Sequence, residues 1–539
     1  MGVFAYRSGR SNVERCPLAS VVARKSAKSV RRFDCTSAGV LACVRTAAVF
    51  GIEAFTIQVE ADVSFGLPAF TMVGLPDASV RESRDRVRSA IRNSGFAFPP
   101  HRITVNLAPA DVRKEGGSFD LPIAIAVLAA AGLLQRRDVD DVLLIGGLSL
   151  DGGLQAARGV LPVAAAARRE RFRGLLLPWA NHGEASLVAG LDLYAVESLT
   201  QAVAALNDPA AHRAPPPPAM GQATQPAHDG DFADVHGQLL ARRALEVAAA
   251  GGHNTLLVGP PGSGKTMMAR WVASILPPLT FDEALDVTSI HSVAGLIAPG
   301  AGLVMSRPFR APHHTASDVA LVGGGSVPRP GEISLAHHGV LFLDEMPEFS
   351  RRVLEVLRQP LEEGCVRIAR AAKTALFPAR FMLIGAMNPC PCGYFGDESR
   401  PCRCTPVQAE RYAARLSGPL RDRIDLAVGV SAVAARDLER PAGGEPSDTI
   451  RNRVVEARRR QVGREGRLNA QLQGQALRAH VALDAAGRRL LTRALEKLTM
   501  TARGFDRLLR VSRTIADLAG SDVVSAEHLA EALQFRGTD

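Results

Sequence analysis

The sequence predicts an α/β fold followed by a helical C-terminal part, and three observations support this prediction. Short apolar runs alternate with amphipathic stretches of helical length from about residue 40 to residue 430. Glycine and proline clusters separate these runs, as expected where strands lead into helices. From about residue 447 the chain is rich in Leu, Ala and Arg at helical spacing. Alternating strands and helices indicate sheets covered by helices.

The first α/β part is predicted to cover residues 37–207. The expected strands are 44–59, 70–74, 102–106, 142–145 and 174–178, and the expected helices are 80–94, 121–134 and 162–171. Residues 208–230 contain a run of prolines with mixed Ala, Gly, Gln and His, which predicts a linker. The second α/β part, 231–430, and a helical part, 431–539, follow.

Length and composition set outer limits on the class of protein. A chain of 539 residues allows roughly three or four domains. Much of the net charge of +10 lies in residues 1–36, which hold eight basic and two acidic residues and are expected to form a disordered, dispensable extension. A DNA-touching arm, a transit-like segment and an over-extended translation start are the alternatives. Global charge is therefore weak support for nucleic-acid binding. No secretory signal or membrane-length apolar run is visible, so we expect a cytoplasmic protein without membrane contact.

The strongest motif fits the phosphate-loop pattern G-x-x-x-x-G-K-[ST]. It consists of Gly259, Pro260, Pro261, Gly262, Ser263, Gly264, Lys265 and Thr266. An apolar run precedes it and a helical stretch follows, which is the context that phosphate binding needs. Lys265 is expected to reach the β/γ-phosphates and the Thr266 hydroxyl to ligate Mg²⁺. The motif predicts that the chain binds ATP and Mg²⁺.

A second apolar strand, at about 339–343, ends in Asp344 and Glu345. Parallel sheets place ligand groups at the carboxyl ends of their strands, so both acids are expected beside the phosphate loop. Asp344 would hold Mg²⁺, directly or through water, and Glu345 would act as the general base that polarises the attacking water.

Four cysteines follow a third apolar strand at 381–387. Cys390, Cys392, Cys402 and Cys404 form two C-x-C pairs, and four thiolates in close pairs suit a tetrahedral soft metal, most simply structural Zn²⁺. The one-residue spacer is tighter than the usual C-x₂-C. Free or redox-active thiols are the alternative.

Three phrases in the first part carry a family resemblance, at residues 66–77, 106–111 and 114–122. Together with the phosphate-binding motifs they resemble the magnesium-chelatase-like AAA+ ATPases, the YifB/ComM family. The resemblance extends from about residue 40 to the C-terminus. It implies a Lon-C-like N-terminal domain (ribosomal S5 domain 2-like), a P-loop AAA+ core and an α-helical C-terminal lid.

The resemblance also implies roles for residues outside the phosphate-binding motifs. Val235 and Gln238 would lie nearest the adenine, Asn388 would position the lytic water as sensor 1, Arg423 would be the arginine finger, and Arg503 would contact the γ-phosphate as sensor 2. Arg421 stands where the family pattern has leucine. Arg507, Arg510 and Arg513 are expected to be surface or intersubunit charges.

Two segments resemble insertions found in the branch of AAA+ proteins shared by magnesium chelatase and the replicative MCM helicases. Residues 289–315 match the helix-2 insert, and residues 362–380 match the pre-sensor-1 hairpin, in which Arg367, Arg370 and Lys373 would suit DNA phosphates. A solvated basic hairpin is the alternative. The pair His313 and His314 is expected to be structural.

By resemblance, the function is that of a homo-hexameric, ATP-driven DNA motor. It would be a helicase acting on single-stranded or branched DNA and promoting branch migration when incoming DNA recombines during natural transformation. A second hypothesis is a chaperone-like ATPase that remodels a protein partner, similar to the magnesium chelatase motor subunit. A third is a Ser-Lys peptidase using Ser118, but residues 159–165 hold no lysine where the related protease supplies its base.

Overall fold

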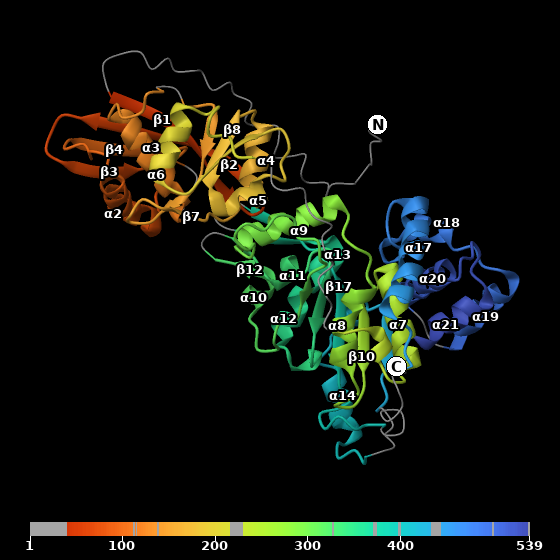
Figure 1. The fold of residues 1–539 in the computed structure, drawn as a ribbon. Helices are drawn as coiled ribbons and strands as arrows, with labels where there is room; N and C mark the ends of the chain where they lie inside the picture. The colour runs from red at the N-terminus through yellow and green to blue at the C-terminus, as the bar shows by residue number, and fades with distance from the viewer. Residues whose placement is uncertain are drawn as a thin grey trace, which may run out of the picture.

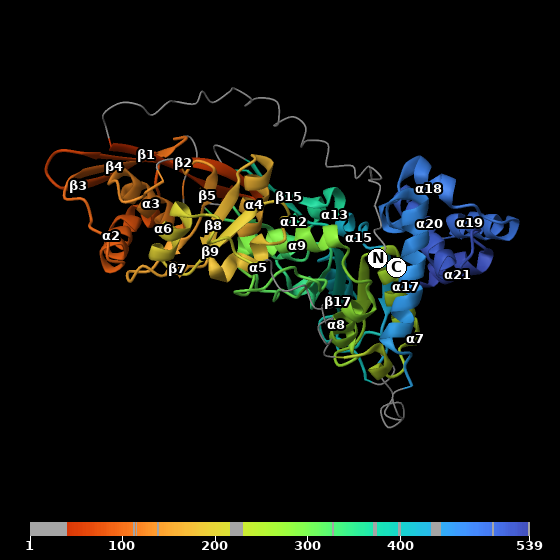
Figure 2. The ribbon, with the colours of Figure 1, turned by 45° about the horizontal axis from the view of Figure 1, so that its top comes forward.

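The computed structural model describes residues 40–110, 114, 116–136, 139–215, 230–325, 328–369, 374–396, 400–432, 443–497 and 501–536. Three parts follow one another: a sheet with its helices (red to yellow), a second sheet (green to cyan) and a group of helices (blue) (Figure 1). Figure 2 shows the same succession from another side. The predicted extension 1–36 lies outside the described residues, as does most of the predicted linker.

The N-terminal part is built on a seven-stranded mixed sheet with the order β3-β4-β2-β1-β5-β8-β9. The strands are β1 (Val40–Phe50), β2 (Glu53–Ser64), β3 (Ala69–Val73), β4 (Arg102–Ala108), β5 (Val142–Leu144), β8 (Gly174–Pro178) and β9 (Asp192–Val196). The central pairs β1–β2 and β2–β4 are antiparallel, and the other pairs are parallel. Two short strands, β6 (Gly147–Leu148) and β7 (Leu154–Gln155), pair separately.

Helices cover this sheet because each presents an apolar face to it. They are α2 (Ala78–Asn93), α3 (Asp120–Ala130), α4 (Val160–Arg169), α5 (His182–Ala185) and α6 (Leu199–Asn207). One core cluster joins α2, α3 and α6 to the sheet, and a second joins α4 and α5 to it. α3 is apolar on every side and is buried almost throughout, as its sequence predicts.

Two local predictions for this part were wrong. The segment 44–59, expected as one strand, is a hairpin, because Gly51 adopts a positive φ of 66° and reverses the chain between β1 and β2. The helix expected over 121–134 ends at Ala130, just before Gly132, whose φ is 73°.

The second part contains a five-stranded, all-parallel sheet with the order β11-β14-β17-β10-β18. The strands are β10 (Thr255–Val258), β11 (Phe309–Arg310), β14 (Val340–Leu343), β17 (Met382–Met387) and β18 (Leu426–Gly429). The first strand in the chain, β10, lies between the fourth and the fifth. After β10 the chain builds β11, β14 and β17 on one side of it and then crosses to β18 on the other side. Sheets of this kind bind ligands at the carboxyl ends of the strands where the strand order reverses.

Helices and short hairpins surround this second sheet. The helices are α7 (Leu239–Gly251), α8 (Lys265–Ile275), α9 (Phe281–Ala294), α10 (Asp318–Val322), α11 (Glu332–Leu335), α12 (Arg351–Val356), α13 (Arg358–Glu363), α14 (Pro406–Ala413) and α15 (Gly418–Arg421). The paired strands are β12 (Gly323–Gly324) with β13 (Arg329–Pro330), and β15 (Cys365–Ala369) with β16 (Thr374–Pro378). The described residues thus contain the predicted hairpin before β17.

The described residues 443–536 are mainly helical, as predicted. They form α17 (Ser447–Glu465), α18 (Gly474–His480), α19 (Ala485–Lys497), α20 (Ala502–Leu518) and α21 (Ala526–Gln534). Ser525 caps α21, with its side chain accepting the His528 N–H. The imidazole of His253, after α7, bonds Asp425 at 3.0 Å and the Thr514 hydroxyl of α20 at 2.8 Å.

One arginine of α20 lies where the sequence did not place it. Arg513, expected at the surface, is fully buried and pairs with Asp517 at 2.9 Å. Its guanidinium also donates to the Asp522 and Ser521 carbonyl oxygens. A buried arginine is tolerated here because a carboxylate one turn along the helix compensates its charge.

The N-terminal part meets the second sheet through two contacts, which we call the junction. In the first, Phe50 and Ile52 beside the β1–β2 turn pack against the core cluster that includes β15 and β16. In the second, α4 and α5 lie against α9 and the loop after it, as both ribbon views show (Figures 1 and 2). Residues 289–294 of the predicted insert belong to α9, and residues that follow them reach the N-terminal part.

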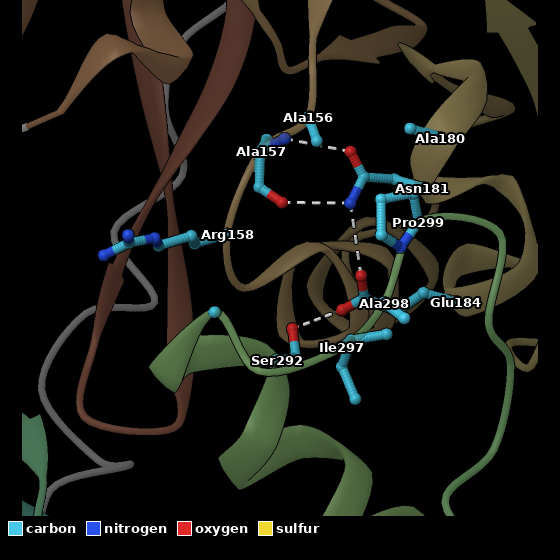
Figure 3. A pocket seen from close by; sticks show the side chains of 11 residues that line it. Ala156, Ala157, Arg158, Ala180, Asn181, Glu184, Ser292, Ile297, Ala298 and Pro299 are labelled. Carbon is cyan, nitrogen blue, oxygen red and sulfur yellow. Dashed lines mark hydrogen bonds between the residues drawn. The ribbon is translucent and has the colours of Figure 1, made fainter.

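The second contact of the junction surrounds a cavity of about 150 Å³ (Figure 3). The buried Glu184 carboxylate accepts hydrogen bonds from the Ser292 hydroxyl and from the Leu161 N–H, and Asn181 donates to its other oxygen at 3.3 Å. The Asn181 amide also exchanges two 2.9 Å hydrogen bonds with the backbone of Ala157. Burial raises the pKa of Glu184, against the opposing effect of these hydrogen bonds.

Candidate nucleotide site and cysteine cluster

The predicted phosphate loop joins the carboxyl end of β10 to the start of α8. Gly262 and Gly264 adopt φ values of 77° and 85°, which favour glycine, and Lys265 is the first residue of the helix. The Gly259 N–H donates to the Met387 carbonyl oxygen at 3.1 Å, so the loop is held to the end of β17. The new helix directs its positive end toward the loop.

The Lys265 ammonium is largely buried at the centre of this loop. Nζ donates to the carbonyl oxygens of Gly259 and Pro260, both at 2.8 Å, and lies 3.4 Å from Asn388 Oδ1. Burial lowers the pKa of Lys265, while the carboxylates of Asp344 and Glu345 oppose that shift. The structure thus brings Asn388, from the end of β17, to the phosphate loop.

The two acids after β14 reach the same edge of the sheet. Asp344 Oδ2 accepts a 2.7 Å hydrogen bond from the Thr266 hydroxyl. A hydroxyl and a carboxylate are oxygen ligands of the kind that Mg²⁺ prefers, and a hydroxyl–carboxylate pair after a phosphate loop fits this ion. Glu345 has a left-handed backbone with φ 49°, and its side chain is about half exposed.

Sequence reasoning missed a residue beside Glu345. His314 Nδ1 lies 3.5 Å from Glu345 Oε2, and the His314 ring meets the Phe349 ring edge-on at 6.4 Å. The His313 ring lies tilted against the His314 ring, with 4.1 Å between the ring centroids, and its Nδ1 bonds the Thr315 hydroxyl. The sequence signal for this contact is the His313–His314 pair, but the pair does not indicate Glu345 as a partner, so the sequence predicts only a structural role.

The two residues expected near the adenine differ in burial: Val235 belongs to the core, and Gln238 is partly exposed. Val235 is buried in the main core cluster of the second part. Gln238 donates through Nε2 to the Ser431 carbonyl oxygen, which follows β18. Because the ends of β18 and β10 are in register, with Gly429 opposite Val258, Gln238 lies at the same edge of the sheet as the phosphate loop.

Arg423 and Arg503 lie at the amino-terminal ends of the strands, the opposite end of the sheet from the phosphate loop. Arg423 precedes β18, and its carbonyl oxygen accepts a 2.8 Å bond from Asn254, which precedes β10. Its guanidinium pairs with Glu362. Arg503 Nη1 lies 3.4 Å from Asp422 Oδ2. The four residues of β10 span about 13 Å, so the structure does not bring either arginine to the phosphate loop of its own chain.

Three segments match magnesium-chelatase families. Residues 59–181 match "Subunit ChlI of Mg-chelatase", residues 231–438 match "Magnesium chelatase, subunit ChlI", and residues 444–536 match "Magnesium chelatase, subunit ChlI C-terminal". A magnesium-chelatase 67 kDa subunit of Chlorobaculum parvum is 28% identical over 164 residues, which cover 29% of this chain and 23% of that protein.

More extensive similarity comes from two bacterial relatives. The YifB protein of Salmonella typhimurium is 44% identical over 504 residues, covering 93% of this chain and 97% of that protein. The competence protein ComM of Haemophilus influenzae is 44% identical over 501 residues, covering 92% and 97%.

The chain belongs to the magnesium-chelatase-like YifB/ComM family. This confirms the family predicted from the motifs, and the parallel sheet with its phosphate loop is the AAA+-type domain of this chain.

The β15–β16 hairpin gives a partial view of the predicted DNA contacts. Arg367 lies in β15 and pairs with Glu363 at 3.0 Å, with its side chain about one-third exposed. Arg370 and Lys373 lie outside the described residues.

The four predicted cysteines come together in one cluster. Their Sγ atoms all lie within 4.8 Å of one another, and three of the separations are 3.4, 3.5 and 3.7 Å. A tetrahedral Zn²⁺ with Zn–S bonds of about 2.3 Å places its sulfurs about 3.8 Å apart, so the cluster fits this ion. Backbone N–H groups of Arg403 and Tyr394 lower the pKa of Cys392 to about 6. The pKa of Cys402 is instead raised to about 12: the backbone N–H of Cys404 lowers it, but burial and the neighbouring thiols outweigh that effect.

A second group of possible metal ligands, Asp286, His337 and His338, does not fit a metal. His337 is buried and its pKa lies well below the usual value, so its ring is neutral. Nδ1 accepts the Arg380 N–H at 2.9 Å, which leaves the proton on Nε2. Neither nitrogen of His337 then offers a free lone pair to an ion.

Proposed function

We propose that this protein is an ATPase whose hydrolytic site is formed by the phosphate loop, Asp344, Glu345 and Asn388. The observation that carries the proposal is their convergence at one edge of the parallel sheet, with Lys265 Nζ 3.4 Å from Asn388 Oδ1 and the Thr266 hydroxyl 2.7 Å from Asp344. Lys265 and the backbone N–H groups of residues 262–266 bind the phosphates, and Glu345 takes a proton from the attacking water. Asn388 orients that water. Val235 and Gln238 flank the adenine of the bound nucleotide.

Thr266 and Asp344 are the residues that would hold Mg²⁺. The ion supplies charge neutralisation for the phosphates when bound. The hydroxyl–carboxylate pair that the chain presents supports this assignment.

We infer that the active form is a homo-hexameric ring in which Arg423 and Arg503 serve the site of a neighbouring subunit. Their position at the edge of the sheet opposite the phosphate loop supports this, because one chain alone offers its site neither arginine. If Arg423 is the finger, its replacement by alanine should lower the rate of hydrolysis by about 10³-fold or more. Arg423→Ala should leave nucleotide binding and assembly intact, whereas a purely structural Arg423–Glu362 pair would affect stability only.

The proposed work is DNA translocation that drives branch migration during recombination of incoming DNA. The similarity to a competence protein over nearly the whole chain supports this, as does the basic hairpin with Arg367, Arg370 and Lys373. The deciding experiment is ATP-dependent branch migration on a synthetic four-way junction. A protein whose ATPase rate ignores DNA, and which does not bind DNA in a salt-dependent way, would instead be a remodeller of a protein partner.

The cysteine cluster is proposed to hold a structural Zn²⁺ through Cys390, Cys392, Cys402 and Cys404. The mutual sulfur distances support it. One metal ion per chain should be found by mass spectrometry, and Cys402→Ser should remove it. Equal metal content in the two proteins would reject the site.

The proposed domain organisation follows the same family. The Lon-C-like domain 37–207 guides the substrate, the linker 208–230 leads to the AAA+ core 231–430, and 431–539 forms the lid. Ser118 is not given a catalytic role, because residues 159–165 hold no lysine that could serve as its base. The ammonium of the buried Lys114 donates hydrogen bonds to the backbone oxygens of Gly74 and Pro109.

A further inference from the structure

The cysteine cluster and the phosphate loop contact each other directly. Gly393 lies between the two cysteine pairs with φ 89°, and a β-carbon built on it would stand 2.5 Å from Cδ and 2.8 Å from Cγ of Pro261. Pro261 is the third residue of the phosphate loop. The space is filled by the proline ring, so only glycine allows the cysteine loop this close an approach.

A second connection runs through β17. Met387, its last residue, accepts the Gly259 N–H, and Asn388 lies 3.4 Å from the Lys265 ammonium. Cys390, two residues further on, is completely buried and takes part in the sulfur cluster at 3.4 and 3.7 Å. The same short segment therefore carries a residue of the nucleotide site and a cysteine of the cluster.

Neither connection depends on a hydrophobic core beneath the loop. Between the cysteine pairs the described side chains, such as Tyr394 and Phe395, are partly or largely exposed. A loop with so little buried apolar surface does not hold one conformation by packing alone, whereas four thiolate bonds to one ion would fix it.

We propose that a thiophilic divalent cation held by the four cysteines is a positioning element of the nucleotide site: it presses Gly393 against Pro261 and fixes Asn388 beside Lys265. This rests on the proposed ATPase function and adds to it a dependence of nucleotide affinity on the cluster. Loss of the cation releases the loop, and the phosphate loop and Asn388 lose their support. Nucleotide binding then weakens although every nucleotide-binding residue is present.

A matched pair of glycines tests the contact. Gly393→Ala places a methyl group against Pro261, while Gly396→Ala, in the same loop and with φ 78°, meets nothing within 4 Å. Both substitutions carry the same left-handed backbone strain, so their difference reports the contact with Pro261. We expect Gly393→Ala to weaken binding of a fluorescent ATP analogue by about 10-fold relative to Gly396→Ala, the usual scale of overpacking, at unchanged metal content.

The double variant Gly393→Ala, Pro261→Ala guards against general misfolding. Removing the proline ring makes room for the methyl group, so the double variant should bind the analogue more tightly than Gly393→Ala alone. A Gly393→Ala protein that binds as well as Gly396→Ala would overturn the proposal, and so would a double variant no better than the single one.

Metal removal tests the cation itself. The full-length protein, stripped with a strong chelator, should lose the same order of affinity for the analogue and regain it when Zn²⁺ is added back. Unchanged affinity after proven metal loss would overturn the positioning role while leaving the ATPase proposal intact. A native protein that never binds the analogue would instead refute the proposed function itself.

Discussion

The phosphate site and the junction both join segments far apart in the sequence, but they do so with different kinds of residue. The phosphate site brings together Lys265 and Asn388, 123 residues apart, through groups whose chemistry few other side chains can replace. The junction brings together Glu184 and Ser292, 108 residues apart. The cavity around them is lined mainly by small or apolar residues, together with Arg158 and Asn181. Chemistry leaves a signature in the sequence, whereas shape complementarity leaves almost none.

If this contrast is correct, a substitution in the phosphate site should remove activity without changing stability. Glu345→Gln should lower the ATP hydrolysis rate by about 100-fold or more, because the general base is lost while binding is kept. Glu348→Gln, three residues along and paired with Arg415 at 2.9 Å, is the matched control. Hydrolysis and thermal melting of both variants decide the matter, and normal turnover by Glu345→Gln would remove Glu345 from its assigned role.

A substitution in the junction should do the reverse. A β-carbon on Gly183 would stand 2.7 Å from the Gly300 carbonyl oxygen and 3.0 Å from that of Ala301. Gly183→Ala should destabilise the junction by about 1–3 kcal/mol, the cost of overpacking against backbone, with nucleotide affinity retained. Hydrogen exchange of the loop 295–301 measures this effect.

Gly463→Ala is the control for Gly183→Ala, because it is also helical and meets nothing within 4 Å. It should leave exchange in the loop unchanged. Equal exchange in the two variants would mean that the contact at Gly183 does not hold the junction together.

A smaller loss is expected from the hydrogen bond between the two parts. Ser292→Ala removes one donor from the buried Glu184 carboxylate and should cost about 1 kcal/mol. Ser289→Ala, on the same helix, removes only a bond to the Leu285 carbonyl oxygen. Chemical denaturation of the two variants compares them, and a larger loss from Ser289→Ala would contradict the role of the junction bond.

The smallest effect is a pH dependence. Burial raises the pKa of Glu184 above its ordinary value of 4.5, so the folded state favours the protonated form. The contribution of Glu184 to stability is therefore fully present below about pH 4.5 and declines as the pH rises through the raised pKa. The melting temperature of the wild type, relative to Glu184→Gln, should fall across this range, and a flat difference would show that Glu184 does not titrate there.

The local structure around the phosphate loop could be predicted from the sequence, because each part is a short pattern of strand, turn and helix. The positions of Gly264, Lys265 and Asp344 follow from such patterns, and so does the hairpin β15–β16.

The failures are instructive for the same physical reason. The apolar alternation of 44–59 continues across the turn at Gly51, so periodicity alone did not reveal the reversal. Arg513 is buried because Asp517 and two carbonyl oxygens meet it, and β9 exists because β8 offers it an edge. The contact of His314 with Glu345 depends on the path of the chain after β11, which brings the two residues together. Such contacts depend on the assembled fold.

Arg423 and the phosphate loop lie at opposite ends of the strands, and this has a consequence for mixtures of two inactive variants. In the proposed ring, the nucleotide site of each subunit is completed by the arginines of one neighbour, and its own arginines complete the site of the other neighbour. A variant lacking Lys265 still has an intact Arg423, and a variant lacking Arg423 still has an intact phosphate loop. Two preparations that are each inactive would then restore one another when their subunits exchange, since some boundaries in the shared assembly contain both intact halves.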